Sequence, residues 1–109
     1  MKPVVLLIGR LPQVIGNVAQ QLQHLPIEWL GAHDQAEVIH QLEAEPRITC
    51  VVMGAGLDDS VRGALIGVIA SRRPDVSIHL KDRSSGSEGL VPFVERVVRP
   101  MVLEQLQPG

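Results

Sequence analysis

Four short runs of β-favouring residues alternate with stretches of helical periodicity, and this alternation restricts the fold more than any other feature of the chain. The runs cover 3–8, 27–32, 48–53 and 76–80. The third run is the most uniformly β-favouring, which is typical of a central strand. Glu28 within the second run favours an edge position, where one flank meets water. Strands that alternate with helices predict a parallel sheet of order 2-1-3-4 in a three-layer α/β domain with helices on both faces.

The first two predicted helices have clear boundary signals. The first begins at Pro12 and should end before Pro26, with apolar residues at helical spacing on its inner face: Val14, Ile15, Val18, Leu22 and Leu25. Asp34 and Glu37 form a capping box, which predicts a second helix from about Gln35 to Ala44.

The third and fourth helices are predicted over 59–73 and from Leu90 onwards. In the third we expect Val61, Leu65, Val68 and Ile69 to face the sheet. Two glycines lie four residues apart in it, at 63 and 67; close contact with the sheet is one interpretation and a helix-helix dimer seam is the other. Pro100 predicts a kink or break near Arg99, followed by a second short helix to Leu106. Residues 107–109 are expected to fray.

Composition indicates one globular domain, residues 1–109. Hydrophobic residues make up 45% and charged residues 20%, with a net charge of −2, which argues against a nucleic-acid-binding basic surface. Trp29 and Phe93 are the two aromatic residues, too few for a base-stacking platform. The apolar start, Val4 to Ile8, is too short for a signal segment or a membrane span, so we expect a cytoplasmic protein that does not contact membranes. Cys50 lies in an apolar run and is interpreted as a buried structural thiol.

The candidate site lies where the predicted strands end, because ligands of parallel sheets bind outside the carboxyl ends of the strands. The stretch from Ile48 to Asp59 leaves the central strand through Gly54-Ala55-Gly56, where small residues allow backbone N–H groups to approach an anion. A turn that requires positive φ is the alternative interpretation. Asp58 and Asp59 would repel an anion and are interpreted as N-caps. The candidate ligand-binding residues are Gly9, Arg10, His33, Asp34, Gly54, Gly56 and Lys81, with help from Arg83.

Several established site motifs are absent from the sequence. The first turn reads Gly9-Arg10-Leu11-Pro12 and lacks a dinucleotide fingerprint, and no Gly-Lys-Ser/Thr occurs. The stretch from Ser84 to Ser87 matches no nucleophile motif and is interpreted as a flexible linker. Four histidines show no metal-ligand spacing: His24, His33, His40 and His79. We therefore expect neither a metal nor a cofactor, and no catalytic residue is assigned.

The chain resembles the receiver domains of two-component response regulators and, more broadly, flavodoxin-like and Rossmann-like domains. The likeness lies in VVLLIG as a first strand, in the unit TCVVMGAGLDDSVRGALIGVIASRRPDVSIHL, and in RRPDV before the fourth strand. It covers most of the chain. The family has five βα units and this sequence has room for four, so the resemblance implies that one unit before the last helix has been lost.

The resemblance also implies that phosphorylation is absent. Receivers bind Mg²⁺ through two acidic residues just after the first strand, and the matching positions here are Gly9 and Arg10. They accept phosphate on an aspartate at the end of the third strand, where this chain has Met53 and Gly54. Lys81 could stand in for the family's phosphate-contacting lysine, but from a different strand. The implied function is a non-catalytic, receiver-like regulatory or protein-interaction domain. The alternative is a Rossmann-like domain that binds a small molecule, an anion or a nucleotide, or a small enzyme using the same rim.

The lost unit has a consequence for assembly. Without it, the fourth strand has an unpaired side that must be covered or paired. The stretch from Val97 to Leu106 carries more apolar residues than one helix face can bury. Together these features predict a homodimer through the fourth strand and the last helix, with a further, unidentified protein partner.

Overall fold

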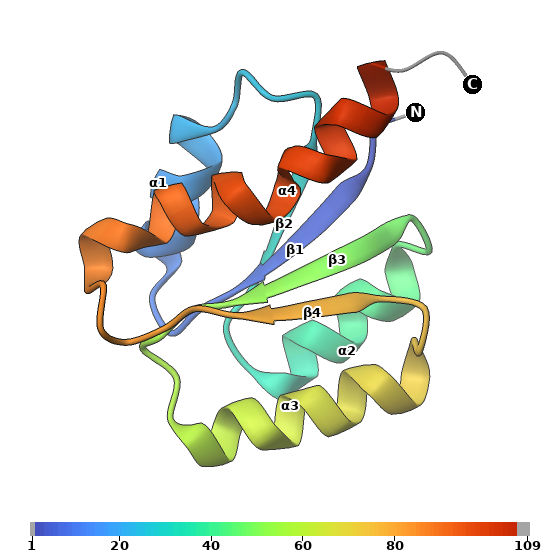
Figure 1. Ribbon diagram of the computed structural model, residues 1–109. Coiled ribbons are helices and arrows are strands. Elements are labelled where there is room, and N and C mark those ends of the chain that lie inside the picture. Colours follow the sequence, from blue (N-terminus) through green and yellow to red (C-terminus); the bar gives the residue numbers. More distant parts are fainter. Residues whose placement is uncertain (1, 107–109) are drawn as a thin grey trace.

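The computed structural model describes residues 2–106, and it contains the predicted sheet. All four strands are parallel, and their order is β2-β1-β3-β4 (Figure 1). Their bounds are β1 Val4–Ile8, β2 Glu28–Ala32, β3 Ile48–Met53 and β4 Ser77–Leu80. The predicted α/β class and strand order are confirmed, and the architecture is of the flavodoxin-like or Rossmann-like type. Residues 107–109, expected to fray, lie outside the described residues.

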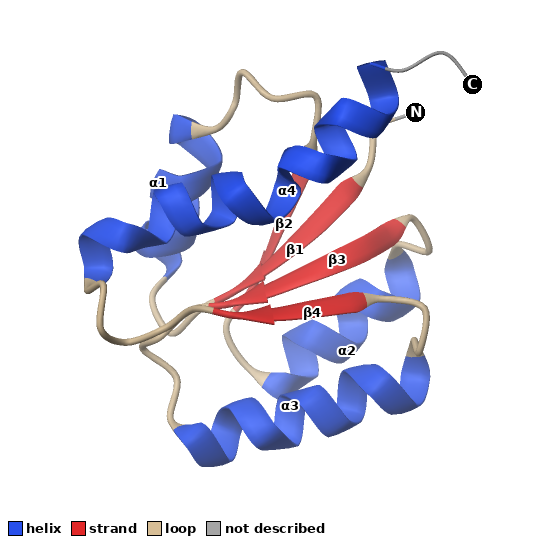
Figure 2. Ribbon diagram, viewed as in Figure 1, coloured by secondary structure: helices blue, strands red, loops and turns tan. Residues whose placement is uncertain are grey.

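Helices cover both faces of the sheet, as Figures 1 and 2 show. One face carries α1 (Pro12–Gln21) and α4 (Leu90–Leu106), and the other carries α2 (Gln35–Ala44) and α3 (Asp59–Arg72). A short 3-10 helix, η1 (Ser87–Gly89), leads into α4. Each face has its own cluster of buried aliphatic side chains. The three-layer arrangement follows from strands that are apolar on both sides.

Burial separates the central strands from the edge strands. All five residues of β1 and five of the six in β3 are buried, whereas β2 has a single buried residue and β4 none. Glu28 is exposed at the start of β2, as predicted for an edge strand. β4 is the opposite edge of the sheet, and within the described residues it pairs with β3 alone. The expected unpaired side of the fourth strand is therefore present.

Capping sets the bounds of α2 as predicted. The Asp34 carboxylate accepts a hydrogen bond of 2.8 Å from the Glu37 N–H. The Glu37 carboxylate reaches back to the His33 N–H, at 2.9 Å, one residue before the usual capping-box partner. By contrast α1 has Leu11 at its N-cap, where no side chain caps the helix, and it ends at Gln21 rather than close to Pro26.

The predicted inner face of α3 is confirmed at Leu65 and Ile69, which are buried, and is wrong at Val61. Val61 is 41% exposed, and the residue beside it, Arg62, is 6% exposed. The buried residues of the helix are Arg62, Leu65 and Ile69, so the stripe that faces the sheet begins one residue later than predicted. Gly63 and Gly67 are exposed, and an added Cβ at either would meet no atom within 4 Å. Close packing on the sheet is thus not the reason for these two glycines.

Of the kink or break predicted near Arg99, the break and the second short helix are wrong, because α4 is one helix through Pro100. Buried Val98 precedes the proline, and Met101 and Val102 after it pack against the same apolar cluster. Contacts on both sides therefore hold the two halves in one helix, and Pro100 itself lies on the exposed side. None of the helices in the described part of the chain has the length and apolar character needed to cross a membrane.

Cys50 in β3 is buried, as predicted. Its exposed fraction is 2%, and it forms no disulfide. Burial raises the pKa of its thiol above the ordinary value, partly offset by a hydrogen bond with Ser77.

Candidate functional site

The carboxyl ends of the four strands are level, so the residues that follow them form one rim. Ile8 is in register with Ala32 on one side and with Met53 on the other, and Met53 is in register with Leu80. The ladder continues one residue further through three backbone hydrogen bonds: Gly9 N–H to Ala32 O at 3.1 Å, Gly54 N–H to Ile8 O at 2.9 Å and Lys81 N–H to Met53 O at 2.9 Å. These bonds fix the starting points of the rim loops.

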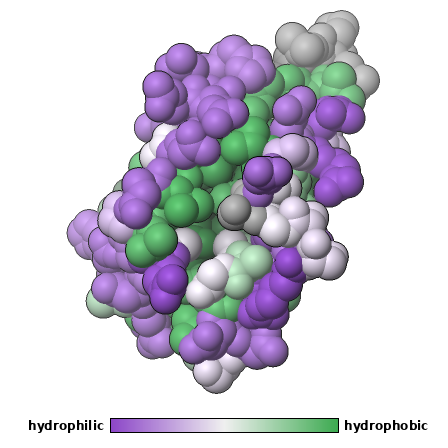
Figure 3. All heavy atoms as spheres, turned by 90° about the vertical axis from the view of Figure 1, so that its left-hand side faces the viewer, coloured by the Kyte–Doolittle hydropathy of each residue, from purple (hydrophilic) through white to green (hydrophobic). Residues whose placement is uncertain are grey.

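A hollow of about 420 Å³ opens at this rim between three loops and the beginnings of α1 and α4. Figure 3 looks onto this end of the molecule and shows a band of hydrophobic residues between hydrophilic ones. Five of the seven predicted ligand-binding residues come together here, which are Gly9, Arg10, Gly54, Gly56 and Lys81. The other lining residues are Leu11, Val14, Ala55, Arg83, Gly86 and Leu90. We call this the carboxyl-end hollow.

The two remaining predicted residues, His33 and Asp34, lie elsewhere. They line a neighbouring hollow, which shares Arg10 and Gly56 with the first. Asp34 caps α2, and His33 Nδ1 lies 2.9 Å from the Glu37 carboxylate. His33 Nε2 is buried and has no hydrogen-bond partner among the described residues. Both side chains therefore serve the start of α2, and the structure does not bring them into the carboxyl-end hollow.

Lys81 lies in the hollow but is not a free surface cation. Its side chain is 2% exposed, and the ammonium donates to the carbonyl oxygen of Asp82, at 2.6 Å, and to Ser85 Oγ. The Asp82 carboxylate is 3.5 Å away. Lys81 thus organises the loop between β4 and α4 from within.

The same loop is held by the Asp82 carboxylate. It accepts hydrogen bonds from Ser84 Oγ at 2.8 Å, from the Ser85 N–H at 2.9 Å and from Ser85 Oγ at 3.1 Å. The hydrogen bond from Ser84, together with those from Ser85 and the charge of Lys81, lowers the pKa of Asp82 well below its usual range. A stretch interpreted from its composition as a flexible linker is therefore a hydrogen-bonded turn.

Arg62 is the rim residue that sequence reasoning missed. From the sheet-facing side of α3 its guanidinium donates to Gly54 O, at 2.8 Å, and to Lys81 O, at 2.6 Å. These carbonyls belong to the segments that leave β3 and β4. No carboxylate pairs with Arg62 in the described part of the chain, and burial, with the nearby charge of Arg83, lowers its pKa. The missed signal was its spacing, since 62, 65 and 69 follow a helical stripe.

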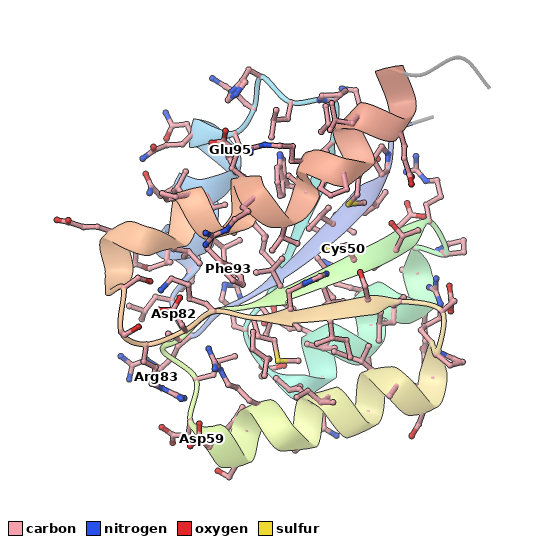
Figure 4. All side chains as sticks on the ribbon, viewed as in Figure 1. Cys50, Asp59, Asp82, Arg83, Phe93 and Glu95 are labelled. Atoms are coloured by element: carbon pink, nitrogen blue, oxygen red, sulfur yellow. The ribbon has the colours of Figure 1, made fainter. Side chains whose placement is uncertain are left out.

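Arg83 makes a second link across the rim. Its guanidinium donates to Leu57 O at 2.7 Å and lies 2.8 Å from the Asp59 carboxylate. Figure 4 shows Arg83 pointing from the loop after β4 towards Asp59 at the start of α3. The pairing with Arg83 gives Asp59 a role other than capping. Asp58 occupies the N-cap position of α3, but its side chain makes no capping hydrogen bond, so that part of the N-cap prediction is wrong.

The backbone conformation of the loop after β3 does not require glycine at Gly54 or Gly56. Gly86 is the one glycine with positive φ in the described chain, so the interpretation of Gly54-Ala55-Gly56 as a positive-φ turn is wrong. A Cβ at Gly54 would make an ordinary contact of 3.6 Å with Ile8 O, and one at Gly56 would meet nothing within 4 Å. Arg10, beside these glycines, has no hydrogen bond or ion pair with any described residue.

The charged side chains that line the carboxyl-end hollow are cationic, and two of them, Lys81 and Arg83, lie close to the carboxylates of Asp82 and Asp59. Of the described residues that line the hollow, three are basic and none is acidic. No group of three His, Cys, Asp or Glu side chains able to hold a metal ion occurs in the described residues. No protein-family model, curated protein or solved structure matches the chain.

Proposed function

We propose that the chain is a non-catalytic, receiver-like regulatory or protein-interaction domain that is not phosphorylated and functions as a homodimer. The observation that carries this proposal is the open side of β4 at the edge of the sheet. Leu80 on β4 is 42% exposed, and Leu103 on α4 is 51% exposed, so both elements of the expected interface present apolar side chains. An unprotected edge strand readily pairs with another chain.

The composition of the rim supports the absence of phosphoryl transfer. Gly9 and Arg10 follow β1, and Met53 at the end of β3 is fully buried. Of the two acids that follow the loop after β3, Asp58 is the N-cap residue of α3 and Asp59 is paired with Arg83. We therefore expect beryllofluoride with Mg²⁺ to leave the ¹H–¹⁵N spectrum unchanged, and a saturable response would contradict this part of the proposal.

Light scattering coupled to size exclusion tests the dimer. At tens of micromolar the chain should have twice its mass of 11.9 kDa. Leu80→Lys places a charge on the open edge and should give a monomer. Val61→Lys is the matched control, because Val61 is equally exposed, at 41%, but lies on α3; it should stay dimeric. A monomeric wild-type chain at this concentration would refute the proposal.

A second candidate function is small-molecule binding, which the carboxyl-end hollow favours. It does not compete with dimerisation, because the hollow lies at the ends of the strands and the open side of β4 runs along the sheet edge. A thermal-shift screen of nucleotides and phosphorylated metabolites, repeated with Arg10→Ala, tests it broadly.

A further inference from the structure

The carboxyl-end hollow combines positive charge with an apolar wall. It is lined by Arg10, Lys81 and Arg83 and by no carboxylate from the part of the chain that the structure describes. Leu11 and Val14 also line it and remain 40% and 39% exposed, which makes them two of the five large apolar side chains exposed in the described chain. Ligand pockets in proteins are concave, mostly apolar and contain a few converging polar groups. At about 420 Å³ the hollow also falls in their size range.

Two of the three cations in the hollow already have partners within the protein. Arg83 is paired with Asp59, and the Lys81 ammonium is held by its own loop. Arg10 contacts no charged group of the described chain and can turn to a ligand without losing a partner. Arginine binds carboxylates and phosphates through two parallel hydrogen bonds.

Backbone donors lie beside Arg10. The N–H groups of Arg10, Leu11, Ala55 and Gly56 donate to no group in the described part of the chain. Leu11 also leaves the start of α1 without a side-chain cap or an acidic residue in its first turn. A leucine at an N-cap costs roughly 1 kcal/mol relative to serine or aspartate. Its aliphatic side chain instead extends the apolar wall of the hollow.

The glycine at 56 keeps the hollow open although the fold does not need it. Its φ is not positive, and an added Cβ would meet no atom within 4 Å. Gly56 lines the hollow, so any larger side chain there would take up space that a ligand could use. The absence of a side chain at Gly56 allows a ligand in the hollow to approach the main chain closely.

We propose that the carboxyl-end hollow binds a small organic anion. Its acidic group is held by Arg10 and by the free N–H groups of the two adjacent loops, and its apolar body packs against Leu11, Val14 and Leu90. This inference deepens the second candidate function proposed above, small-molecule binding in the same hollow, and does not depend on the regulatory and dimeric function. An inorganic anion alone would leave the apolar wall exposed, and a neutral apolar molecule would leave Arg10 without a partner.

Three related probes separate these contributions. 1-Naphthyl phosphate carries both an acidic group and an apolar body. 1-Naphthol lacks the acidic group, and inorganic phosphate lacks the apolar body. In ¹H–¹⁵N titrations of the full chain, 1-naphthyl phosphate should shift the resonances of Arg10, Leu11 and residues 54–56 saturably. Its affinity should be at least about tenfold higher than that of 1-naphthol or inorganic phosphate, because the acidic group and the apolar body both contribute to binding. No saturable shift up to 10 mM, or shifts centred elsewhere, would overturn the proposal.

Two variants locate the site. Arg10→Ala should lower the affinity for 1-naphthyl phosphate about tenfold. Arg99→Ala, on the exposed side of α4, should leave this affinity unchanged. Gly56→Leu should abolish binding by filling the hollow, and Gly63→Leu, at a second glycine with no atom within 4 Å of an added Cβ, is its matched control. Circular dichroism of each variant verifies folding. Binding that survives in both Arg10→Ala and Gly56→Leu would refute the assignment, and a dimer that binds none of the probes would refute this inference alone.

Discussion

The guanidinium of Arg62 donates a 2.6 Å hydrogen bond to the carbonyl oxygen of Lys81. A second bond from the same nitrogen, at 2.8 Å, goes to Gly54 O. One side chain on α3 thereby joins the segment that leaves β3 to the segment that leaves β4. Both Arg62 and Lys81 are almost fully buried, at 6% and 2% exposure. The rim therefore contains two buried cations that are satisfied mainly by backbone carbonyls and a hydroxyl group.

Arg62→Met should destabilise the protein by about 2 kcal/mol or more, because two carbonyl oxygens lose their donor at a buried position. Urea unfolding followed by circular dichroism measures this free energy. Arg72→Met is the matched control on the same helix, since Arg72 pairs with exposed Glu43 at 3.1 Å and should contribute less than about 1 kcal/mol. Equal losses in the two variants would show that the Arg62 link contributes little.

Gly63→Ala and Gly67→Ala should each raise the free energy of unfolding by about 0.5 to 1 kcal/mol, because both glycines lie in the exposed interior of a helix with free space around them. Gly86→Ala should have the opposite effect, since Gly86 has φ of 68°. The same urea titration compares all three. If the two helix variants lowered stability and also dissociated the dimer, the helix-helix seam considered for these glycines would be favoured over the β4 edge.

Asp82 should remain ionised well below pH 3.8, the ordinary pKa of an aspartate, because hydrogen bonds from Ser84 and Ser85 lower its pKa. A group with a depressed folded-state pKa stabilises the fold above its unfolded-state pKa, and this contribution is lost as the pH falls through the folded-state value. Asp82→Asn should therefore reduce stability at neutral pH and weaken its pH dependence below about pH 4. A carboxyl ¹³C titration gives the pKa directly, and a midpoint at or above 4 would contradict the prediction.

Cys50 should react very slowly with Ellman's reagent in the native protein at pH 8, because its thiol is buried and burial raises its pKa. Reaction should become fast in urea at concentrations that unfold the chain. Rapid stoichiometric labelling without denaturant would show that β3 opens readily at this position.

The features predicted well from the sequence are those fixed locally or by general topology. The bounds of α2 follow from the Asp34 cap and the Pro46 that follows the helix, both of which act within a few residues. The central position of β3 follows from its unbroken β-favouring residues. The strand order follows because right-handed crossovers restrict the possible connections.

The features that were missed depend on contacts between distant segments. Two stripes on α3 fit a helical period, one with Val61 and one with Arg62, and hydropathy favoured the valine. Only the carbonyls of Gly54 and Lys81, eight and 19 residues away, make a buried arginine favourable. The burial of Lys81 likewise depends on the turn that Asp82 and Ser85 form. The continuity of α4 through Pro100 depends on the packing of α4 against the sheet face that α1 also covers.

The links made by Arg62 and Arg83 give the carboxyl-end hollow two walls of different stiffness. On the side of β3, β4 and α3, side chains fasten each loop to its neighbour, so that wall should move as a unit with α3. On the other side, α1 starts at Leu11 without any such fastening. An occupant of the hollow would therefore be accommodated by a shift of the first turn of α1, and the α1–α4 layer is where a change of shape would be transmitted to the rest of the molecule.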